Sequence, residues 1–349
     1  MIQMIKTNRH KKRRPVKIIL FAVMFAAIVF AIILCMNDRT ETNGRNVTVI
    51  TPPEGTNPNG GTSEHTGNGT SAITPVATPA QEATHIPTQT PVPTLTPTPF
   101  PRDMEGLKKE IEDYILEQPG KYGLYFINLV NGDEFGINDK DEFIAASTTK
   151  LPMNLLLYKK IASGEIDPNS ILTYLEEDFE PGSGVVQKSE YGTEYTVRET
   201  ARLSIVYSDN CAINMIIRLL GIDNIRNYMQ ELGGTVYYGR RHRSCPYDLA
   251  LYTRELYRFY IESPEIAGIL IEDLQNTMWN DRINKYLPEG VKVSHKIGTF
   301  EGVCNDVGII FADEPYVLAV MSDGVEHAAA ADVIGEISKK IYYYLENSR

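Results

Sequence analysis

The stretch EFIAASTTKLPMN, which runs from Glu142 to Asn154, places a serine three residues before a lysine where a helical pattern begins. Residues three apart on a helix share a face, so the amine of Lys150 can reach the hydroxyl of Ser147. The positive end of the helix dipole disfavours a proton on a nearby lysine, and a neutral amine can take the serine proton. Taken alone, this S-x-x-K string also fits a capped surface helix with a solvated lysine.

A second short string, Ser208-Asp209-Asn210, lies further along the chain, just before an amphipathic helical pattern. The Ser208 hydroxyl can relay a proton from the base to a leaving nitrogen. The Asn210 amide can donate to a substrate carbonyl and hold Lys150. All three residue types are also good helix N-caps, so this string by itself fits a structural role.

A third string, Lys296-Ile297-Gly298-Thr299, ends a β-rich run. A cation at Lys296 can bind a substrate carboxylate, and Gly298 allows another segment of backbone to come close. By itself the string also fits an exposed lysine on an edge strand. Two histidines, His242 and His295, are interpreted as structural or surface residues. The occurrence of all three strings in this order, each with matching secondary structure, indicates a catalytic site.

The order of the predicted elements indicates how the chain folds. Helical spacing at 104–117 precedes a strand-turn-strand pattern at 121–138, and β-rich runs return at 291–324 before a last helix at 330–346. This order predicts an α/β (α+β) fold: an antiparallel sheet from N- and C-terminal strands, flanked by helices, with an inserted all-α subdomain. The helical patterns of the insert cover 150–164, 196–221, 223–234 and 245–263.

The first 102 residues predict a membrane anchor followed by a linker. Residues 1–17 hold seven Lys and Arg and no acid, which predicts a cytoplasmic segment. Residues 18–36 carry no charge and would span about 28 Å as a helix, enough to cross a bilayer. The alternative, a cleaved signal peptide, would have a shorter apolar region and a small-residue cleavage site. Residues 37–102 predict a disordered Thr/Pro-rich linker. The remaining 103–349 would then be an extracellular catalytic domain on a single-pass protein of the cell membrane.

Charge and cysteine content exclude several classes of protein. The chain has a net charge of −11. Its first 102 residues hold 10 Lys and Arg and 5 Asp and Glu. Residues 103–349 therefore hold 24 Lys and Arg and 40 Asp and Glu, a net charge of −16. Such an acidic domain is a poor nucleic-acid binder. Its cysteines, Cys211, Cys245 and Cys304, are widely spaced, which indicates neither a zinc site nor a disulfide framework, although a Cys245–Cys304 bridge is conceivable. With no dinucleotide or P-loop motif either, no metal or cofactor is expected.

The ordered set S-x-x-K, S-D-N and K-x-G resembles that of the penicillin-recognising serine enzymes, the class A β-lactamases and related penicillin-binding proteins. The likeness covers essentially all of 103–349 and extends to the segments FIAASTTKLPM, GSGVVQ, YTVRETARLSIVYSDNCAINMII and NDVGIIFA, in their usual order. It implies a β-lactamase/transpeptidase-like fold.

The resemblance also implies a role for each motif residue. Ser147 would be the acylated nucleophile, Lys150 the base for acylation, and Ser208 the proton relay. The backbone N–H groups of Ser147 and Thr299 would form an oxyanion hole, in which each donor is usually worth ~2.7–4 kcal/mol. The implied substrate-binding residues are Asn210, Lys296, Gly298 and Thr299.

The sequence departs from this family in three ways. Ile297 replaces the hydroxyl residue of K-T-G, so carboxylate binding would depend on Lys296 and Thr299. Pro152 follows Lys150 closely, which suits only the first turn of a helix. Class A enzymes also carry a glutamate after S-D-N that serves as the base for deacylation, but residues 235–254 contain none. Asp248 is the nearest carboxylate, and it is better interpreted as a helix cap.

These observations predict a membrane-tethered acyl-serine hydrolase that acts on β-lactams, with fast acylation and slow deacylation. One alternative is a penicillin-binding-protein-like D-alanyl-D-alanine carboxypeptidase that acts on peptidoglycan. The other alternative is a non-catalytic domain that binds the cell wall or β-lactams. The expected partners are therefore the membrane and a β-lactam or peptidoglycan peptide, and not nucleic acid or metal.

Overall fold

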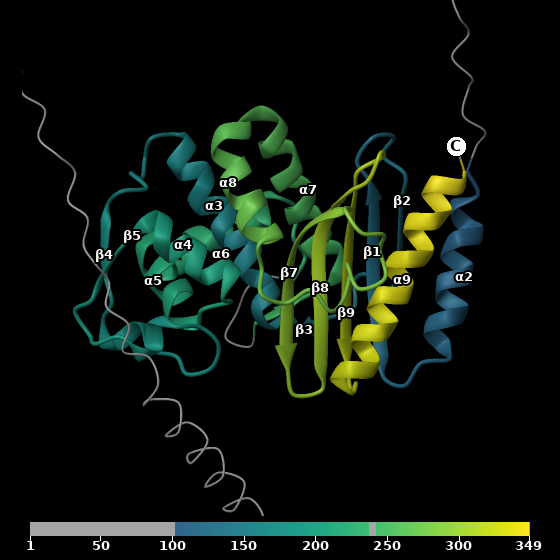
Figure 1. Ribbon diagram of the computed structural model, residues 1–349, viewed down its shortest axis with the longest axis horizontal. Helices are drawn as coiled ribbons and strands as arrows, with labels where there is room; N and C mark the ends of the chain where they lie inside the picture. The colour runs from purple at the N-terminus through teal and green to yellow at the C-terminus, as the bar shows by residue number, and fades with distance from the viewer. Residues whose placement is uncertain (1–101, 237–241, 349) are drawn as a thin grey trace, which may run out of the picture. The chain divides into compact units, whose positions relative to one another are not determined.

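A five-stranded antiparallel sheet forms the centre of the computed structural model, which describes residues 102–236 and 242–348 (Figure 1). The strand order is β2-β1-β9-β8-β7, so the N-terminal hairpin is joined to the three C-terminal strands. This confirms the predicted sheet built from both ends of the domain. The strands are β1 (Lys121–Asn128), β2 (Glu134–Ile137), β7 (Lys292–Phe300), β8 (Val303–Phe311) and β9 (Tyr316–Asp323).

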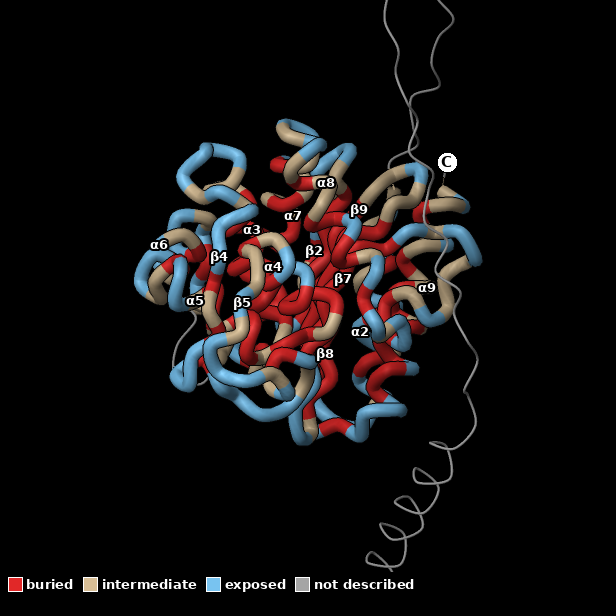
Figure 2. Tube along the Cα trace, turned by 60° about the vertical axis from the view of Figure 1, so that its left-hand side comes forward, coloured by how far each residue is buried: buried red, intermediate tan, exposed pale blue. Residues whose placement is uncertain are grey.

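Each face of the sheet packs against a different set of helices, because successive side chains of a strand point to opposite faces. Leu124 and Phe126 of β1 belong to a core that includes the two terminal helices. Tyr125 and Ile127 belong to a larger core shared with the helical insert. The buried residues gather where the sheet and the helices meet (Figure 2). The terminal helices are α2 (Met104–Leu116) and α9 (His327–Asn347).

The insert between β2 and β7 is mostly helical, as predicted, but it also holds small strands. The helices are α3 (Lys150–Ala162), α4 (Val197–Val206), α5 (Asn210–Leu220), α6 (Ile222–Glu231), α7 (Pro246–Glu262) and α8 (Pro264–Gln275). The sequence interpretation did not include α8, which begins directly after α7 with a proline in its first turn. The small strands form two antiparallel pairs: β3 (Phe143–Ile144) with β6 (Arg243–Ser244), and β4 (Ile171–Thr173) with β5 (Glu194–Thr196).

The opening of α3 explains how a proline is tolerated close to the S-x-x-K string. A 3₁₀ turn, η1 (Ala146–Thr149), precedes α3, and the α-helix itself begins at Lys150. Pro152 therefore lies in the first turn of α3, where its missing N–H costs little. This agrees with the expectation that Pro152 suits only the first turn of a helix, and Ser147 lies in a tight turn rather than in a regular α-helix.

The three cysteines of the domain are free, buried thiols, so the conceivable Cys245–Cys304 bridge does not form. The predicted segments 1–17 and 18–36, and all of 37–102 except its last residue, lie outside the described residues. Within the described residues, no helix is long and apolar enough to cross a membrane.

Candidate active site

The turn that carries Ser147 is pressed against the end of β7. A Cβ atom at Gly298 would lie 2.5 Å from the carbonyl oxygen of Ala145 and 3.0 Å from Cγ2 of Thr148, so only glycine permits this approach. Ala146, just before the serine, has a φ of 49°, in the left-handed region that L-residues rarely adopt. The predicted close approach of backbone at Gly298 is confirmed. Because the turn and the strand lie so close together, Ser147 and Thr299 line the same cleft.

Lys150 is buried and directed at Ser147, as the sequence predicted. Its Nζ donates to Ser147 Oγ at 3.2 Å, to Asn210 Oδ1 at 2.8 Å and to the carbonyl oxygen of Ser208 at 2.5 Å. Burial lowers the pKa of the Lys150 amine from 10.5 to about 8, against the opposing charges of Asp209 and Glu180. About a tenth of this amine is therefore neutral at pH 7, far more than for an ordinary lysine, and a neutral amine can accept the serine proton.

Ser208 lies between two lysines. Its Oγ is 3.4 Å from Lys150 Nζ and accepts a hydrogen bond from Lys296 Nζ at 3.0 Å. Lys296 is fully buried, and burial together with repulsion from Lys150 lowers its pKa well below the ordinary value. The alternative of an exposed edge-strand lysine is therefore wrong. The two amines and the hydroxyls of Ser147 and Ser208 form one continuous path along which a proton can move.

Asp209 holds the turn that presents Ser208. Its carboxylate accepts from the backbone N–H of Ala212 at 3.0 Å, so it is the N-cap of α5. It also accepts from the N–H groups of Val185 at 2.5 Å and Val186 at 2.8 Å. Ser208 itself has a φ of 51°. Backbone strain of this kind is retained when the surroundings impose it, and it gathers at functional sites.

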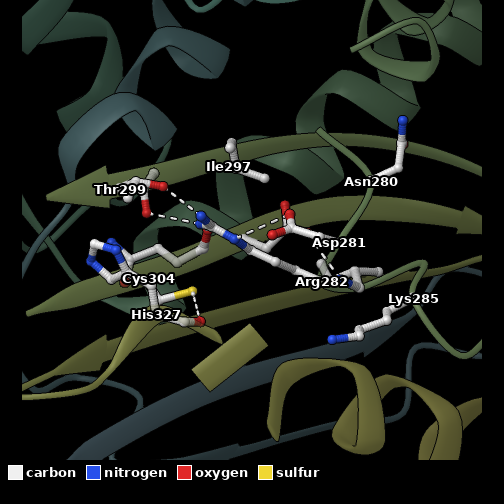
Figure 3. Close-up of polar contacts among 12 residues, drawn as sticks. Asn280, Asp281, Arg282, Lys285, Ile297, Thr299, Cys304 and His327 are labelled. Carbon is white, nitrogen blue, oxygen red and sulfur yellow. Dashed lines mark hydrogen bonds and ion pairs between the residues drawn. The ribbon is translucent and has the colours of Figure 1, made fainter. Parts of the chain in front are cut away.

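Arg282 is a site residue that the sequence did not indicate. Its buried guanidinium donates to the carbonyl oxygens of Gly298 at 3.0 Å and Asn305 at 2.5 Å, and to the hydroxyl of Thr299 (Figure 3). Because the Thr299 oxygen accepts from Arg282, its own O–H can donate to a group in the cleft. The residue before Gly298 is Ile297, which has no hydroxyl. Arg282 instead places a positive charge next to the Thr299 hydroxyl. In sequence, a single arginine in the segment before β7 looks like an ordinary surface residue.

Ser147 lines two cavities. One has a volume of 450 Å³ and extends toward α3 and α5; the other has a volume of 780 Å³ and extends toward Trp279 and His327. The described residues that line both cavities are Ser147, Glu180, Asn210, Thr299 and Phe300. The three predicted strings therefore converge on one cleft whose centre is the serine.

Asp248 lies elsewhere. Its buried carboxylate accepts hydrogen bonds from Thr235 N at 2.8 Å, Thr235 Oγ1 at 2.9 Å and Val236 N at 2.6 Å. It thus holds the segment before α7 rather than capping the first turn of its own helix, which corrects the cap interpretation. It lines neither cavity at Ser147. The reason is that its carboxylate oxygens are engaged by donors from the separate segment 235–236.

The two histidines have different surroundings. His295 is fully buried and contacts both carboxylate oxygens of Asp306 at 2.9 Å and Asn280 Oδ1 at 3.1 Å, which confirms a structural role. His242 lines the 450 Å³ cavity with Ser147, and burial lowers the pKa of its imidazole. Among the residues that the structure describes, no group of His, Cys, Asp and Glu is placed to hold a metal ion.

A serine that accepts a hydrogen bond from a buried lysine, at the edge of an antiparallel sheet with a helical insert, defines the serine hydrolases of the β-lactamase/transpeptidase fold. Residues 106–345 match the Beta-lactamase2 model, the "Beta-lactamase enzyme family", and the chain belongs to this family. Among the curated proteins, it is 27% identical to a β-lactamase of Bacillus licheniformis over 244 residues, which is 63% of this chain and 78% of that protein. It is also 25% identical to β-lactamase 3 of Bacillus cereus over 235 residues, 62% of this chain and 73% of that protein.

The solved structures agree with this family. The structure of PBP-A is 27% identical with a TM-score of 0.66, and the match covers 72% of this chain and all of PBP-A. A variant of PBP-A, solved as an acyl-enzyme complex with penicillin G, is 26% identical with the same TM-score over 71% of this chain and 100% of that chain. A β-lactamase from Sphaerobacter thermophilus is 26% identical with a TM-score of 0.64 over 71% of this chain and 98% of that chain.

Proposed function

We propose that this serine hydrolase opens β-lactams by acylation of Ser147 and that it hydrolyses the acyl-enzyme slowly. The observation that carries the proposal is the hydrogen bond of 3.2 Å between Lys150 Nζ and Ser147 Oγ, made by an amine whose pKa is lowered to about 8. The β-lactamase relatives and the PBP-A acyl-enzyme with penicillin G support β-lactams as the substrate class.

In the proposed acylation, neutral Lys150 takes the proton of Ser147 as its oxygen attacks the lactam carbonyl carbon. The backbone N–H groups of Ser147 and Thr299 would stabilise the oxyanion, which is the interaction that such sites use to lower the barrier. As the lactam C–N bond breaks, the proton passes from Lys150 through Ser208 to the leaving nitrogen. The hydrogen bond from Lys296 to Ser208 Oγ orients this hydroxyl for the transfer.

The need for a neutral lysine makes acylation pH-dependent. Below the pKa of about 8, the protonated amine predominates, and its neutral fraction falls tenfold for each pH unit. We therefore expect the second-order rate constant for labelling by a fluorescent penicillin to rise roughly tenfold per unit from about pH 6 and to level off above about pH 8. A rate constant that does not change with pH across this range would contradict a lysine base.

Arg282 is proposed to support recognition of the substrate carboxylate through Thr299. In Arg282→Gln, we expect kcat/KM for a penicillin to fall roughly tenfold, equivalent to about 1.4 kcal/mol, mainly through KM. An uncharged ester substrate without a carboxylate is the control, and its kcat/KM should change by less than about threefold. Equal losses for both substrates would show that Arg282 only maintains the fold through Gly298 and Asn305, and thermal unfolding of the variant would then shift as well.

Slow deacylation is proposed because, in the described part of the segment between Asn210 and Lys296, no glutamate lines either cavity at Ser147. Asp248, the carboxylate considered from the sequence, accepts hydrogen bonds from Thr235 and Val236 instead. A D-alanyl-D-alanine carboxypeptidase remains the second candidate. The 780 Å³ cavity favours it, because that cavity extends from Ser147 to His327 and leaves room for a peptide longer than a β-lactam. Release of D-alanine from a peptide ending in D-Ala-D-Ala, faster than hydrolysis of a cephalosporin, would favour this candidate.

We also propose that the catalytic domain is tethered outside the cell membrane. The support is the sequence alone: the basic segment 1–17, the uncharged run 18–36 and the Thr/Pro-rich linker 37–102. The full chain should remain with the membrane fraction after a high-salt wash, and protease added to intact cells should release the domain. Recovery of the full chain in the soluble fraction would contradict tethering.

A further inference from the structure

The two cavities beside Ser147 share one acidic side chain, that of Glu180. Among the described residues that line the 450 Å³ cavity, Glu180 is the single carboxylate, and Ser147, Lys150 and His242 line the same cavity. Glu180 also lines the 780 Å³ cavity. It lies in the loop before α5, upstream of the S-D-N string, and not in the downstream segment where the family would supply a glutamate.

Three residues of α5 hold Glu180 in this position. The backbone N–H of Glu180 donates to Cys211 Sγ at 3.5 Å, and its carbonyl oxygen accepts from the same thiol at 3.5 Å. The side-chain amide of Asn214 donates to Glu180 Oε2 at 3.1 Å. Asn210 joins this loop to the base, because its Nδ2 donates to the carbonyl oxygen of Pro181 at 3.2 Å while its Oδ1 accepts from Lys150. The same helix therefore positions Glu180 and Lys150.

The charge of Glu180 acts on the site. It raises the pKa of Lys150 and that of His242, in both cases against the effect of burial. The carboxylate is thus close enough to both groups for its charge to affect their titration. Its side chain is also exposed, so water reaches it freely.

We propose that Glu180 is the general base that activates water to hydrolyse the acyl-enzyme, a role that rests on the proposed acylation of Ser147. Glu180 takes one proton from a water molecule as the water oxygen adds to the acyl carbonyl carbon. The tetrahedral intermediate then collapses, the bond from that carbon to Ser147 Oγ breaks, and the acid product leaves with the hydroxyl that came from water. Glu180 returns its proton through Lys150 to Ser147 Oγ, which restores the free enzyme.

This role agrees with slow turnover. One side-chain hydrogen bond, from Asn214, is seen at the Glu180 carboxylate, and the residue is exposed to solvent. A base held so loosely positions the water less well than a fixed one, and general-base catalysis depends on that geometry.

The test is the lifetime of the penicillin acyl-enzyme in Glu180→Gln, measured by intact-protein mass spectrometry after excess penicillin is removed. Glutamine keeps the shape and can still contact Asn214, but it cannot accept a proton from water. We expect the acylation rate to stay within about threefold and the lifetime to lengthen roughly 10²-fold, the lower end of general-base contributions. Asn214→Ala, which frees the carboxylate, should lengthen it by a smaller factor.

Two controls separate the outcomes. Glu177→Gln changes an exposed glutamate three residues earlier that lines neither cavity, and it should leave the lifetime unchanged. His242→Gln removes the imidazole of the same cavity. If the acyl-enzyme lifetime is unchanged in Glu180→Gln but longer than in the parent in His242→Gln, the role of Glu180 would be overturned. The proposed acylation of Ser147 would still stand. A wild-type protein that forms no acyl-enzyme and hydrolyses no penicillin would instead overturn the proposed function itself.

Discussion

Replacement of Ser147 with alanine is expected to reduce hydrolysis of a chromogenic cephalosporin to the uncatalysed rate and to abolish labelling by a fluorescent penicillin. Without Oγ there is no atom to form the acyl bond, and the partners Lys150 and Ser208 have no nucleophile to activate. Loss of the nucleophile in enzymes of this kind costs on the order of 10⁴–10⁶ in kcat. Circular dichroism and thermal unfolding of the variant should match the parent, because Ser147 is only partly buried.

Ser163→Ala is the matched control. Ser163 follows the last turn of α3, where its hydroxyl donates to the carbonyl oxygen of Lys160 at 3.1 Å, far along the helix from the cleft. This variant should label and hydrolyse at the parental rate. Sustained labelling of Ser147→Ala would mean that another group is acylated, and the proposed nucleophile would be wrong.

Replacement of Lys150 with alanine is expected to slow acylation at least ~10²-fold, because general-base catalysis contributes this much or more. The change removes the donor to Ser147 Oγ and Asn210 Oδ1. Its effect should be on the labelling rate rather than on the binding of penicillin. The measurement is the second-order rate constant for labelling at pH 8, where about half of the parent amine is neutral and able to act as a base.

The control for this prediction is Lys160→Ala, on the same helix. Lys160 forms a salt bridge with Glu165 at 2.5 Å near the end of α3 and does not line the cleft. It should label at the parental rate. A decrease of less than about threefold in Lys150→Ala would refute the role of Lys150 as base.

The central features of the site could be predicted from the sequence because they are local. The spacing of Ser147 and Lys150 fixes their approach within one turn of backbone, and Pro152 marks where the α-helix can begin. The glycine requirement at 298 is equally local in sequence, although its reason, the contact with Ala145, appears only in the fold. The sheet was predictable because its strands carry continuous apolar runs at both ends of the domain.

The remaining features depend on contacts between distant parts of the chain. Arg282 reaches Thr299 only because the segment before β7 folds back under that strand. Glu180 becomes a site residue only because α5 holds its loop against the cleft. Neither residue lies in a motif, so neither could be distinguished from surface charges. Asp248 shows the same limit, because its position in the first turn of α7 suggested a cap while its partners at 235–236 come from another segment.

The central claim is that an acyl-serine forms at residue 147 faster than it breaks down. Intact-protein mass spectrometry of the 103–349 domain after mixing with penicillin G tests it directly, followed by mapping of the modified peptide. We predict that most of the protein gains the whole mass of one penicillin, because ring opening releases no leaving group. The adduct should lie on the peptide that contains Ser147 and decay slowly on dilution. The absence of both adduct and hydrolysis, or an adduct on another residue, would contradict the claim.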